Sequence, residues 1–204
     1  MLSTRRSRVR AIGGVAMAAV VAGVGLVTYN ASAAEVAPVA PAAVGADARA
    51  VSIPQIPAAI KPPKGSKPVG AFFVTKGTQN YTCVVPAGAT TGAFTGKSTP
   101  EAQLVGTGGR VHHFGGPSWQ SLRDQSKIVA DPASAISNPK TGTIAELRLS
   151  VATHEGKGYF DKVDYINRLY TSGGVAPAGS CAAGEVKKVP YGAVYVFWDA
   201  PAGS

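Results

Sequence analysis

Three histidines are the only imidazole groups in the 204-residue chain, and imidazole is the side chain best suited to acid–base chemistry or metal binding near neutral pH. They are His112, His113 and His154. Because adjacent residues of a strand point to opposite faces, His112 and His113 would not hold one ion together. His113 and His154 could form a site with Asp124 or Asp161, but no spacing in the sequence requires it. We therefore predict no metal site and no cofactor.

Nucleophiles and carboxylate pairs, which hydrolases need, stand in no distinguishing context. Ser118 lies between Pro117 and Trp119 rather than in the Gly-x-Ser-x-Gly turn that exposes an acyl-transfer nucleophile. A glycosidase would need two carboxylates at a set distance, and the candidates are Asp124, Asp131, Glu146, Glu155, Asp161 and Asp164. Nothing in the sequence pairs two of them. We predict no catalytic residue, and the sequence does not favour an enzyme.

A glycine-rich run over residues 104–111, Leu-Val-Gly-Thr-Gly-Gly-Arg-Val, begins like a dinucleotide-binding loop. Val111 takes the place of the third glycine. The following residues, His-His-Phe-Gly-Gly-Pro, cannot form the helix whose N-terminus would bind a pyrophosphate. The run is typical of a turn between strands, so a dehydrogenase is not favoured.

Aromatic rings and one arginine remain as candidates for binding. Trp119 follows a Gly-Gly-Pro turn, where an exposed indole could stack on a sugar ring, although packing on the core is the stronger expectation. Arg168 lies among strand residues, where we expect an ion pair with an acid and, as the alternative, an anionic ligand. If the turns around these residues converge, they form a groove. The ligand-binding residues predicted on this basis are His113, Trp119, Asp124 and Arg168.

The candidate binding residues must be positioned by short apolar segments, which are separated by Gly, Pro, Ser and Thr. These segments begin at about Val51. This spacing predicts an all-β fold, a single β-sandwich or barrel-like domain of short, mostly antiparallel strands. The predicted strands are Val69–Thr75, Gln79–Val85, Arg110–Phe114, Lys127–Ala130, Ile144–Thr153, Lys162–Tyr170 and Val189–Trp198. The last of them is apolar on both faces, as expected of a central strand.

The first 33 residues have the pattern of a secretory signal peptide. Arginines at positions 5, 6, 8 and 10 precede an apolar run, Ala11–Val27, that is too short to span a bilayer, and Ala-Ser-Ala follows at 31–33. The Arg-Arg pair raises twin-arginine export, but the polar residues after it favour the general route. Residues 34–50, almost entirely Ala, Val, Pro and Gly, predict a flexible spacer, and residues 51–204 the β-rich domain.

The net charge limits the classes of binding partner that we expect, and the cysteine content predicts a covalent link. The net charge of +9 falls to +5 without the leader, because residues 1–33 hold four arginines and no acid. The remaining Lys and Arg form no stripe with interleaved aromatics, so we predict no nucleic-acid partner and no membrane contact after cleavage.

The only cysteines, Cys83 and Cys181, both fall in the exported part. An oxidising environment there predicts a Cys83–Cys181 disulfide.

Several motifs with glycine, proline and aromatic residues follow one another along the chain. They are Gly77-Thr-Gln-Asn-Tyr-Thr-Cys83, Pro100-Glu-Ala-Gln-Leu104, His113-Phe-Gly-Gly-Pro-Ser-Trp119, Tyr165-Ile-Asn-Arg-Leu-Tyr-Thr-Ser-Gly-Gly-Val-Ala-Pro177 and Val189-Pro-Tyr-Gly-Ala-Val-Tyr-Val-Phe197. Together with the cysteines they resemble a secreted family of bacteria and fungi, known as domain of unknown function three-four-five-five. The resemblance implies export, a β-rich fold and paired cysteines, and no established chemistry.

Two positions depart from the family's pattern. Gln125 stands where the family's Asp-Gly-Ser turn usually has glycine. Glu146 and Arg148 stand in a segment that is usually apolar and contains Trp.

These observations favour a secreted, extracellular or cell-wall-associated domain that binds a cell-wall or extracellular polysaccharide without catalysis. Two alternatives stay open. One is a small secreted hydrolase or metal-dependent enzyme that uses His113, and the other is a structural envelope protein. The sequence identifies neither the ligand nor the oligomeric state.

Overall fold

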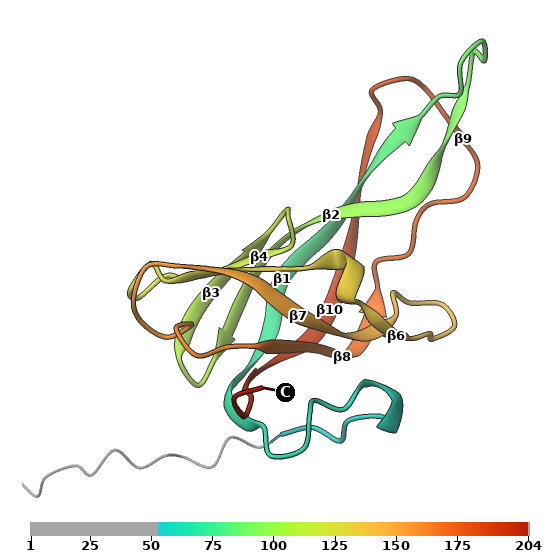
Figure 1. Ribbon diagram of the computed structural model, residues 1–204. Helices are drawn as coiled ribbons and strands as arrows, with labels where there is room; N and C mark the ends of the chain where they lie inside the picture. Colours follow the sequence, from blue (N-terminus) through green and yellow to red (C-terminus); the bar gives the residue numbers. More distant parts are fainter. Residues whose placement is uncertain (1–52, 204) are drawn as a thin grey trace, which may run out of the picture. The chain divides into compact units, whose positions relative to one another are not determined.

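The computed structural model describes residues 53–203 (Figure 1). The chain divides into two units, residues 1–45 and 46–204, and every described residue belongs to the second. The predicted signal peptide and spacer lie outside the described residues. The strands are β1 (Lys67–Val84), β2 (Gly92–Gly106), β3 (Gly109–Phe114), β4 (Ser118–Ser121), β5 (Lys127–Ala130), β6 (Ile136–Asn138), β7 (Glu146–Glu155), β8 (Tyr165–Gly173), β9 (Ser180–Cys181) and β10 (Val186–Asp199). Two short 3₁₀ turns, η1 (Ala58–Ile60) and η2 (Pro132–Ser134), complete them.

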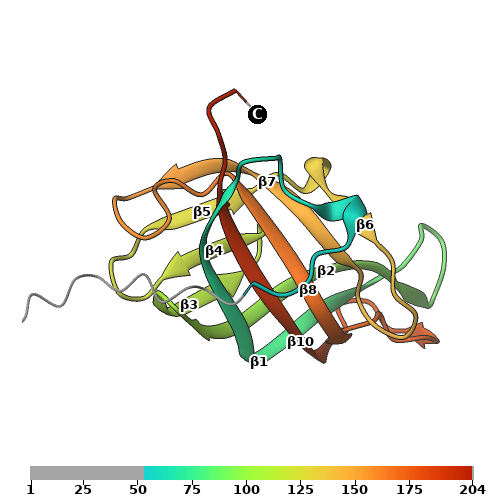
Figure 2. The ribbon, with the colours of Figure 1, turned by 90° about the horizontal axis from the view of Figure 1, so that it is seen from below.

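The strands form one antiparallel sheet that closes on itself. Its order is β1-β10-β8-β7-β5-β4-β3-β2, and β2 pairs with β1 again to close the circle. β6 pairs with β7 beside this path, and β9 with the start of β2. Figure 2 shows the strands crossing around a common interior. The predicted all-β fold is confirmed, and of the two predicted architectures the barrel-like one is found. No helix able to cross a bilayer occurs within the described residues.

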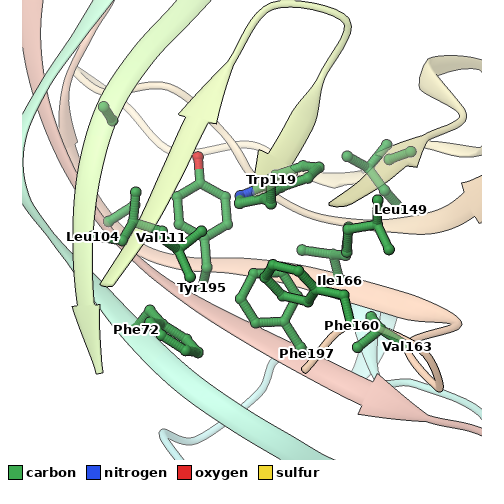
Figure 3. Packing of buried hydrophobic residues seen from close by; sticks show 14 of the residues in the cluster. Phe72, Leu104, Val111, Trp119, Leu149, Phe160, Val163, Ile166, Tyr195 and Phe197 are labelled. Carbon is green, nitrogen blue, oxygen red and sulfur yellow. The ribbon is translucent and has the colours of Figure 1, made fainter. Parts of the chain in front are cut away.

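Large apolar side chains fill the interior of the closed sheet (Figure 3). Phe72, Phe160 and Phe197 are each at most 1% exposed. Their rings pack edge to face, with centroids of Phe160 and Phe197 4.9 Å apart, as aromatic pairs prefer. Inward residues alternate along β10, where Tyr195 follows Ala193 on the same face. The interior is a packed core along most of its length.

The outer face of β10 is buried too, by the segment of residues 53–61, which we call the N-terminal strap. Ile60 in the strap is 0% exposed and packs with Val196 and Trp198 of β10. Asn167 of β8 fixes the strap, because its Nδ2 donates to the Ile60 carbonyl oxygen at 2.8 Å while its Oδ1 accepts from the Trp198 indole at 2.9 Å. Apolar residues on both faces of β10 therefore have separate partners, inside and outside the sheet.

Three strands continue past the closed part as a ribbon, drawn toward the upper right in Figure 1. This ribbon comprises residues 78–84 of β1, 92–101 of β2 and 186–190 of β10. Gly77 lies where it begins, and a Cβ there would come within 2.8 Å of the Tyr191 ring. The predicted Cys83–Cys181 disulfide is confirmed near the end of the ribbon, with Cα atoms 5.9 Å apart.

Candidate functional site

His113 and Trp119, two of the residues predicted to bind ligand, lie in the core. They are 2% and 1% exposed, and their rings stack with centroids 4.2 Å apart and planes 5° from parallel. His113 Nδ1 donates to the backbone oxygen of Ser118 at 2.8 Å. Burial lowers the pKa of His113 to about 3, so the ring is neutral at physiological pH. Neither ring is available to a ligand in this arrangement.

Asp124 holds a turn at the end of the closed sheet where β1 begins. Its carboxylate accepts from the backbone N–H and the hydroxyl of Ser126, at 3.1 and 2.7 Å, and from the N–H of Tyr159 at 3.1 Å. Burial would raise the pKa of Asp124, but hydrogen bonds from Ser126, Ser121 and Tyr159 outweigh it and lower the pKa to about 2. The Tyr159 hydroxyl in turn donates to the Val69 oxygen. These contacts join the β4–β5 turn to the β7–β8 connection.

Arg168 of β8 is half-buried and faces the interior. Its direct neighbours are Tyr195 of β10 and Leu147 of β7, both of which pack in the core cluster. Its Nε and Nη2 donate to the Ala145 oxygen at 3.0 and 2.9 Å, and it also hydrogen-bonds to the Tyr195 hydroxyl. No carboxylate of residues 53–203 forms an ion pair with Arg168. The expected ion pair is thus wrong for the described part of the chain.

The three histidines also have separate partners. His112 Nε2 lies 2.7 Å from Glu101 Oε1 on the outer surface, and His154 Nε2 lies 2.8 Å from the Val163 oxygen. Within residues 53–203 there is no group of three or more His, Cys, Asp or Glu side chains arranged to hold a metal ion.

The four predicted ligand-binding residues consequently do not line one groove. His113 and Trp119 belong to the core, and Asp124 holds a turn at one end of the sheet. Arg168 lines a pocket toward the opposite end. That these residues bind a ligand stays a prediction.

An apolar groove lies at this second end of the closed sheet, and we call it the mouth groove. It has a volume of about 530 Å³. Its lining residues are Lys97, Ser98, Thr99, Pro100, Gly116, Pro117, Pro132, Ala135, Leu147 and Leu149. The two leucines reach it from β7 and also contact the core cluster, so the groove floor is continuous with the core. Prolines on three separate segments form much of its wall.

A second pocket adjoins the mouth groove and contains Arg168, so we call it the Arg168 pocket. It has a volume of about 330 Å³ and is lined by Tyr81, Ser98, Thr143, Ile144, Ala145, Arg168, Val175 and Ala176. Ser98 lines both pockets and therefore marks where they meet. No acidic side chain lines either of them. The only charged residues in the two linings are cations, Lys97 and Arg168.

Polar groups lie behind this junction. The Ser98 hydroxyl donates to Gln79 Oε1 at 2.6 Å, and Gln79 is 2% exposed. The Gln79 side chain also interacts with the Tyr191 hydroxyl. The hydroxyls of Tyr191 and Tyr195 lie 3.3 Å apart, and burial raises the pKa of both, so both stay protonated. The wall of the Arg168 pocket thus contains one cation, Arg168, and neutral polar side chains.

Sequence reasoning missed most residues of this site. Pro100, Gly116, Pro117 and Gln79 stand inside the motifs that carry the family resemblance, so a signal was present, but it pointed to the motif turns rather than to a groove. Ser98 had no signal in the sequence. Its position follows from the pairing of β2 with β1, where it lies opposite Tyr81.

Comparison with known proteins gives a family and no named relative. No curated protein and no solved structure matches the chain. The family model described as Protein of unknown function (DUF3455) matches residues 98–199, which is half of the chain. The matched stretch includes Ser98, the proline-lined turns and Arg168. The chain therefore belongs to the DUF3455 family of proteins of unknown function.

Proposed function

We propose that this protein is a secreted, noncatalytic binding domain whose ligand lies in the mouth groove. The observation that carries the proposal is an apolar groove of about 530 Å³ at one end of the closed sheet. Closed sheets commonly bind small ligands at their mouths. Pro100, Gly116 and Pro117, from two separate family-like motifs, meet in this groove.

The chemistry around the groove supports binding rather than catalysis. A general base must reach its substrate, and His113 is neutral, stacked on Trp119 and 2% exposed. A glycosidase needs carboxylates beside its substrate, and neither pocket lining contains one. Secretion is supported by the predicted signal peptide and by the disulfide, which is typical of exported proteins.

The lining also bears on the class of ligand. Polysaccharide recognition ordinarily uses exposed aromatic rings, but Trp119, the ring predicted for that role, is 1% exposed. The groove instead offers proline rings and the side chains of Leu147 and Leu149. We therefore favour a ligand with an apolar segment, and we treat a cell-wall or extracellular polysaccharide as the competing ligand class.

Filling the groove tests the proposal. Ala135 is exposed and lines the groove, so Ala135→Trp should occupy the space without disturbing the core. Ala133→Trp is the matched control, because Ala133 is exposed on the adjacent 3₁₀ turn and is not part of the lining. Titration with the neutral fluorophore N-phenyl-1-naphthylamine should give a saturable signal that Ala135→Trp weakens at least tenfold and Ala133→Trp leaves unchanged.

Co-sedimentation of the oxidised chain with peptidoglycan, chitin and cellulose tests the competing ligand class. Binding at high salt that persists in Ala135→Trp would place the site outside the mouth groove and contradict the proposal. Binding that disappears at high salt would reflect only attraction between a basic protein and anionic polymers. An equal loss of fluorophore binding in both tryptophan variants would contradict the proposal as well.

A further inference from the structure

Arg168 is a half-buried cation without an anionic partner among the described residues. Withdrawing a guanidinium from water is unfavourable unless hydrogen bonds and opposite charge compensate it. The protein supplies the Ala145 carbonyl oxygen, which accepts two of the five N–H groups, and the Tyr195 hydroxyl. Hydrogen bonds thus orient the group, while its charge is left uncompensated and part of its donor capacity is unused.

The lining of the Arg168 pocket contains one cation and no anionic side chain. Ser98 forms part of its wall, and its hydroxyl donates to Gln79 Oε1. Lys97 adds a positive charge at the rim of the neighbouring mouth groove. Both pockets lack acidic side chains. The charge pattern is complementary to a ligand that carries an anionic group.

The sheet register joins this cation to the apolar groove. Arg168 lies directly opposite Leu147 in the neighbouring strand, and Leu147 lines the mouth groove. Directly opposed side chains have Cβ atoms about 5 Å apart. A ligand whose anionic group reaches Arg168 therefore places its next carbons over the apolar floor.

We infer that the Arg168 pocket is a carboxylate subsite and that the protein binds medium-chain alkyl carboxylates, with the alkyl chain in the mouth groove. This inference rests on the proposed function and names its ligand class. A carboxylate is favoured over a phosphate because it is a monoanion that balances the single charge of Arg168, and Lys97 does not line this pocket. The planar guanidinium also matches a carboxylate in shape.

Calorimetric titration at pH 8 with dodecanoate and with dodecanol, each below its aggregation concentration, separates the head group from the chain. We expect dodecanoate to bind at least tenfold more tightly, as a charge-assisted hydrogen bond provides. Shortening the chain to decanoate should weaken binding about fourfold for each CH₂ removed from the groove. Arg168→Gln should abolish the preference for dodecanoate.

Arg148→Gln is the matched control, because Arg148 precedes Leu149 on β7 and points to the outer face, where it donates to the Lys61 oxygen. It removes one positive charge without touching the pocket and should leave the preference intact. Since Arg168→Gln also loses the contact with Ala145, Ser98→Asp gives a second test that keeps this contact. Its carboxylate should occupy the subsite and abolish the dodecanoate preference while dodecanol still binds.

The outcomes distinguish the two proposals. Equal affinity for dodecanol and dodecanoate, with both blocked by Ala135→Trp, would overturn the carboxylate subsite and leave the groove as the binding site. Absence of binding by either compound would overturn both. Two further results would overturn the assignment to alkyl carboxylates. One is that dodecyl phosphate binds more tightly than dodecanoate, and the other is that oligogalacturonate binds and dodecanoate does not. An equal effect of Arg148→Gln and Arg168→Gln would reduce the preference to general charge and overturn the subsite.

Discussion

Gln125 adopts a left-handed backbone conformation, with φ of 62°, in the turn between β4 and β5. Such a conformation costs a non-glycine residue about 1–2 kcal/mol. The resemblance to the DUF3455 family placed glycine at this position, and the backbone gives the physical reason for that preference. The Gln125 side chain makes only exposed hydrogen bonds, to Gln120 and to the Leu122 oxygen. The departure from the family's pattern is therefore an unfavourable one.

We predict that Gln125→Gly raises the free energy of unfolding by about 0.5–1 kcal/mol, because relief of backbone strain exceeds the loss of exposed hydrogen bonds. Urea denaturation followed by tryptophan fluorescence measures this change. Gln125→Ala is the control, since it loses the same hydrogen bonds and keeps the strain, and it should not stabilise the protein. A decrease in stability with glycine would contradict the strain argument.

His113 should make stability depend on pH. Burial lowers its pKa from 6.5 to about 3, so between these values the unfolded chain takes up a proton that the folded protein does not. The stability that the neutral, buried imidazole gives the folded protein is fully present above pH 6.5 and is lost as pH falls toward 3. We expect this histidine to reduce the free energy of unfolding by about 1.4 kcal/mol per pH unit below 6.5.

Denaturation at pH 7, 6 and 5 checks this expectation, a range in which most carboxylates stay ionised. His113→Gln should flatten the slope, whatever its effect on absolute stability. His112→Gln is the companion variant, and it measures the separate contribution of the neighbouring surface imidazole beside Glu101. The same slope in wild type and His113→Gln would show that another group is responsible.

At the scale of elements, sequence patterning missed the short strands β4, β6 and β9 and one long strand, β2. The first two thirds of β2, over residues 92–101, are rich in Gly, Ser and Thr and include Pro100, all of which weaken a strand prediction. Pro100 is tolerated because it pairs with Gln79 of β1 on one side, while pairing with β3 begins only at Ala102. Tertiary pairing with β1, rather than local propensity, forms this part of the strand.

The predicted strands Val69–Thr75 and Gln79–Val85 are joined in the structure into β1. A shift in register near Thr75 and Lys76 lets one strand continue through the break that the sequence suggested. Strands with clear alternation were predicted well, and Lys127–Ala130 agrees with β5 at both ends. Alternating polarity predicts a strand correctly where one face of that strand packs on the core. It does not predict a strand that contains glycine or proline and is held by pairing with neighbouring strands.

The N-terminal strap is an element without strand pairing, and its contribution rests on Ile60. Ile60→Ala should lower the free energy of unfolding by about 3 kcal/mol, because it leaves a cavity against Val196 and Trp198. Ile136→Ala removes the same atoms from β6, where the side chain is 40% exposed, and should cost under about 1 kcal/mol. Equal costs in urea denaturation would mean that the strap does not stabilise the sheet.

At the scale of the whole described unit, the disulfide joins residues 98 apart in the chain. Removing a link of this length should lower the free energy of unfolding by about 2–4 kcal/mol, mainly by freeing the unfolded chain. The double variant Cys83→Ser/Cys181→Ser tests this in guanidinium denaturation. Wild type in dithiothreitol should match it, and the double variant should not respond to the reductant. Unchanged stability would show that the ribbon holds its register without the bond.

The candidate site could be predicted only in part. Arg168 was identified as a residue that could hold an anion, and Pro100 and Pro117 stood in recognised motifs. The sequence could not show that the Trp119 ring turns inward, because a loop tryptophan can pack on the core or face solvent with the same neighbours in sequence. Nor could it show that Ser98 adjoins Arg168, since that juxtaposition depends on closure of the sheet through β1 and β2.

The position of the disulfide also determines what a single backbone cut would do. The connection between β1 and β2 is mostly exposed over residues 86–91, and Cys83 precedes it while Cys181 follows it. A protease that cleaves in this turn would produce two polypeptides that remain covalently attached through sulfur. The nicked protein should migrate as one species on a non-reducing gel and separate into two fragments on a reducing gel. Hydrolysis in this exposed hairpin would therefore leave the molecule in one piece for as long as its cystine stays oxidised.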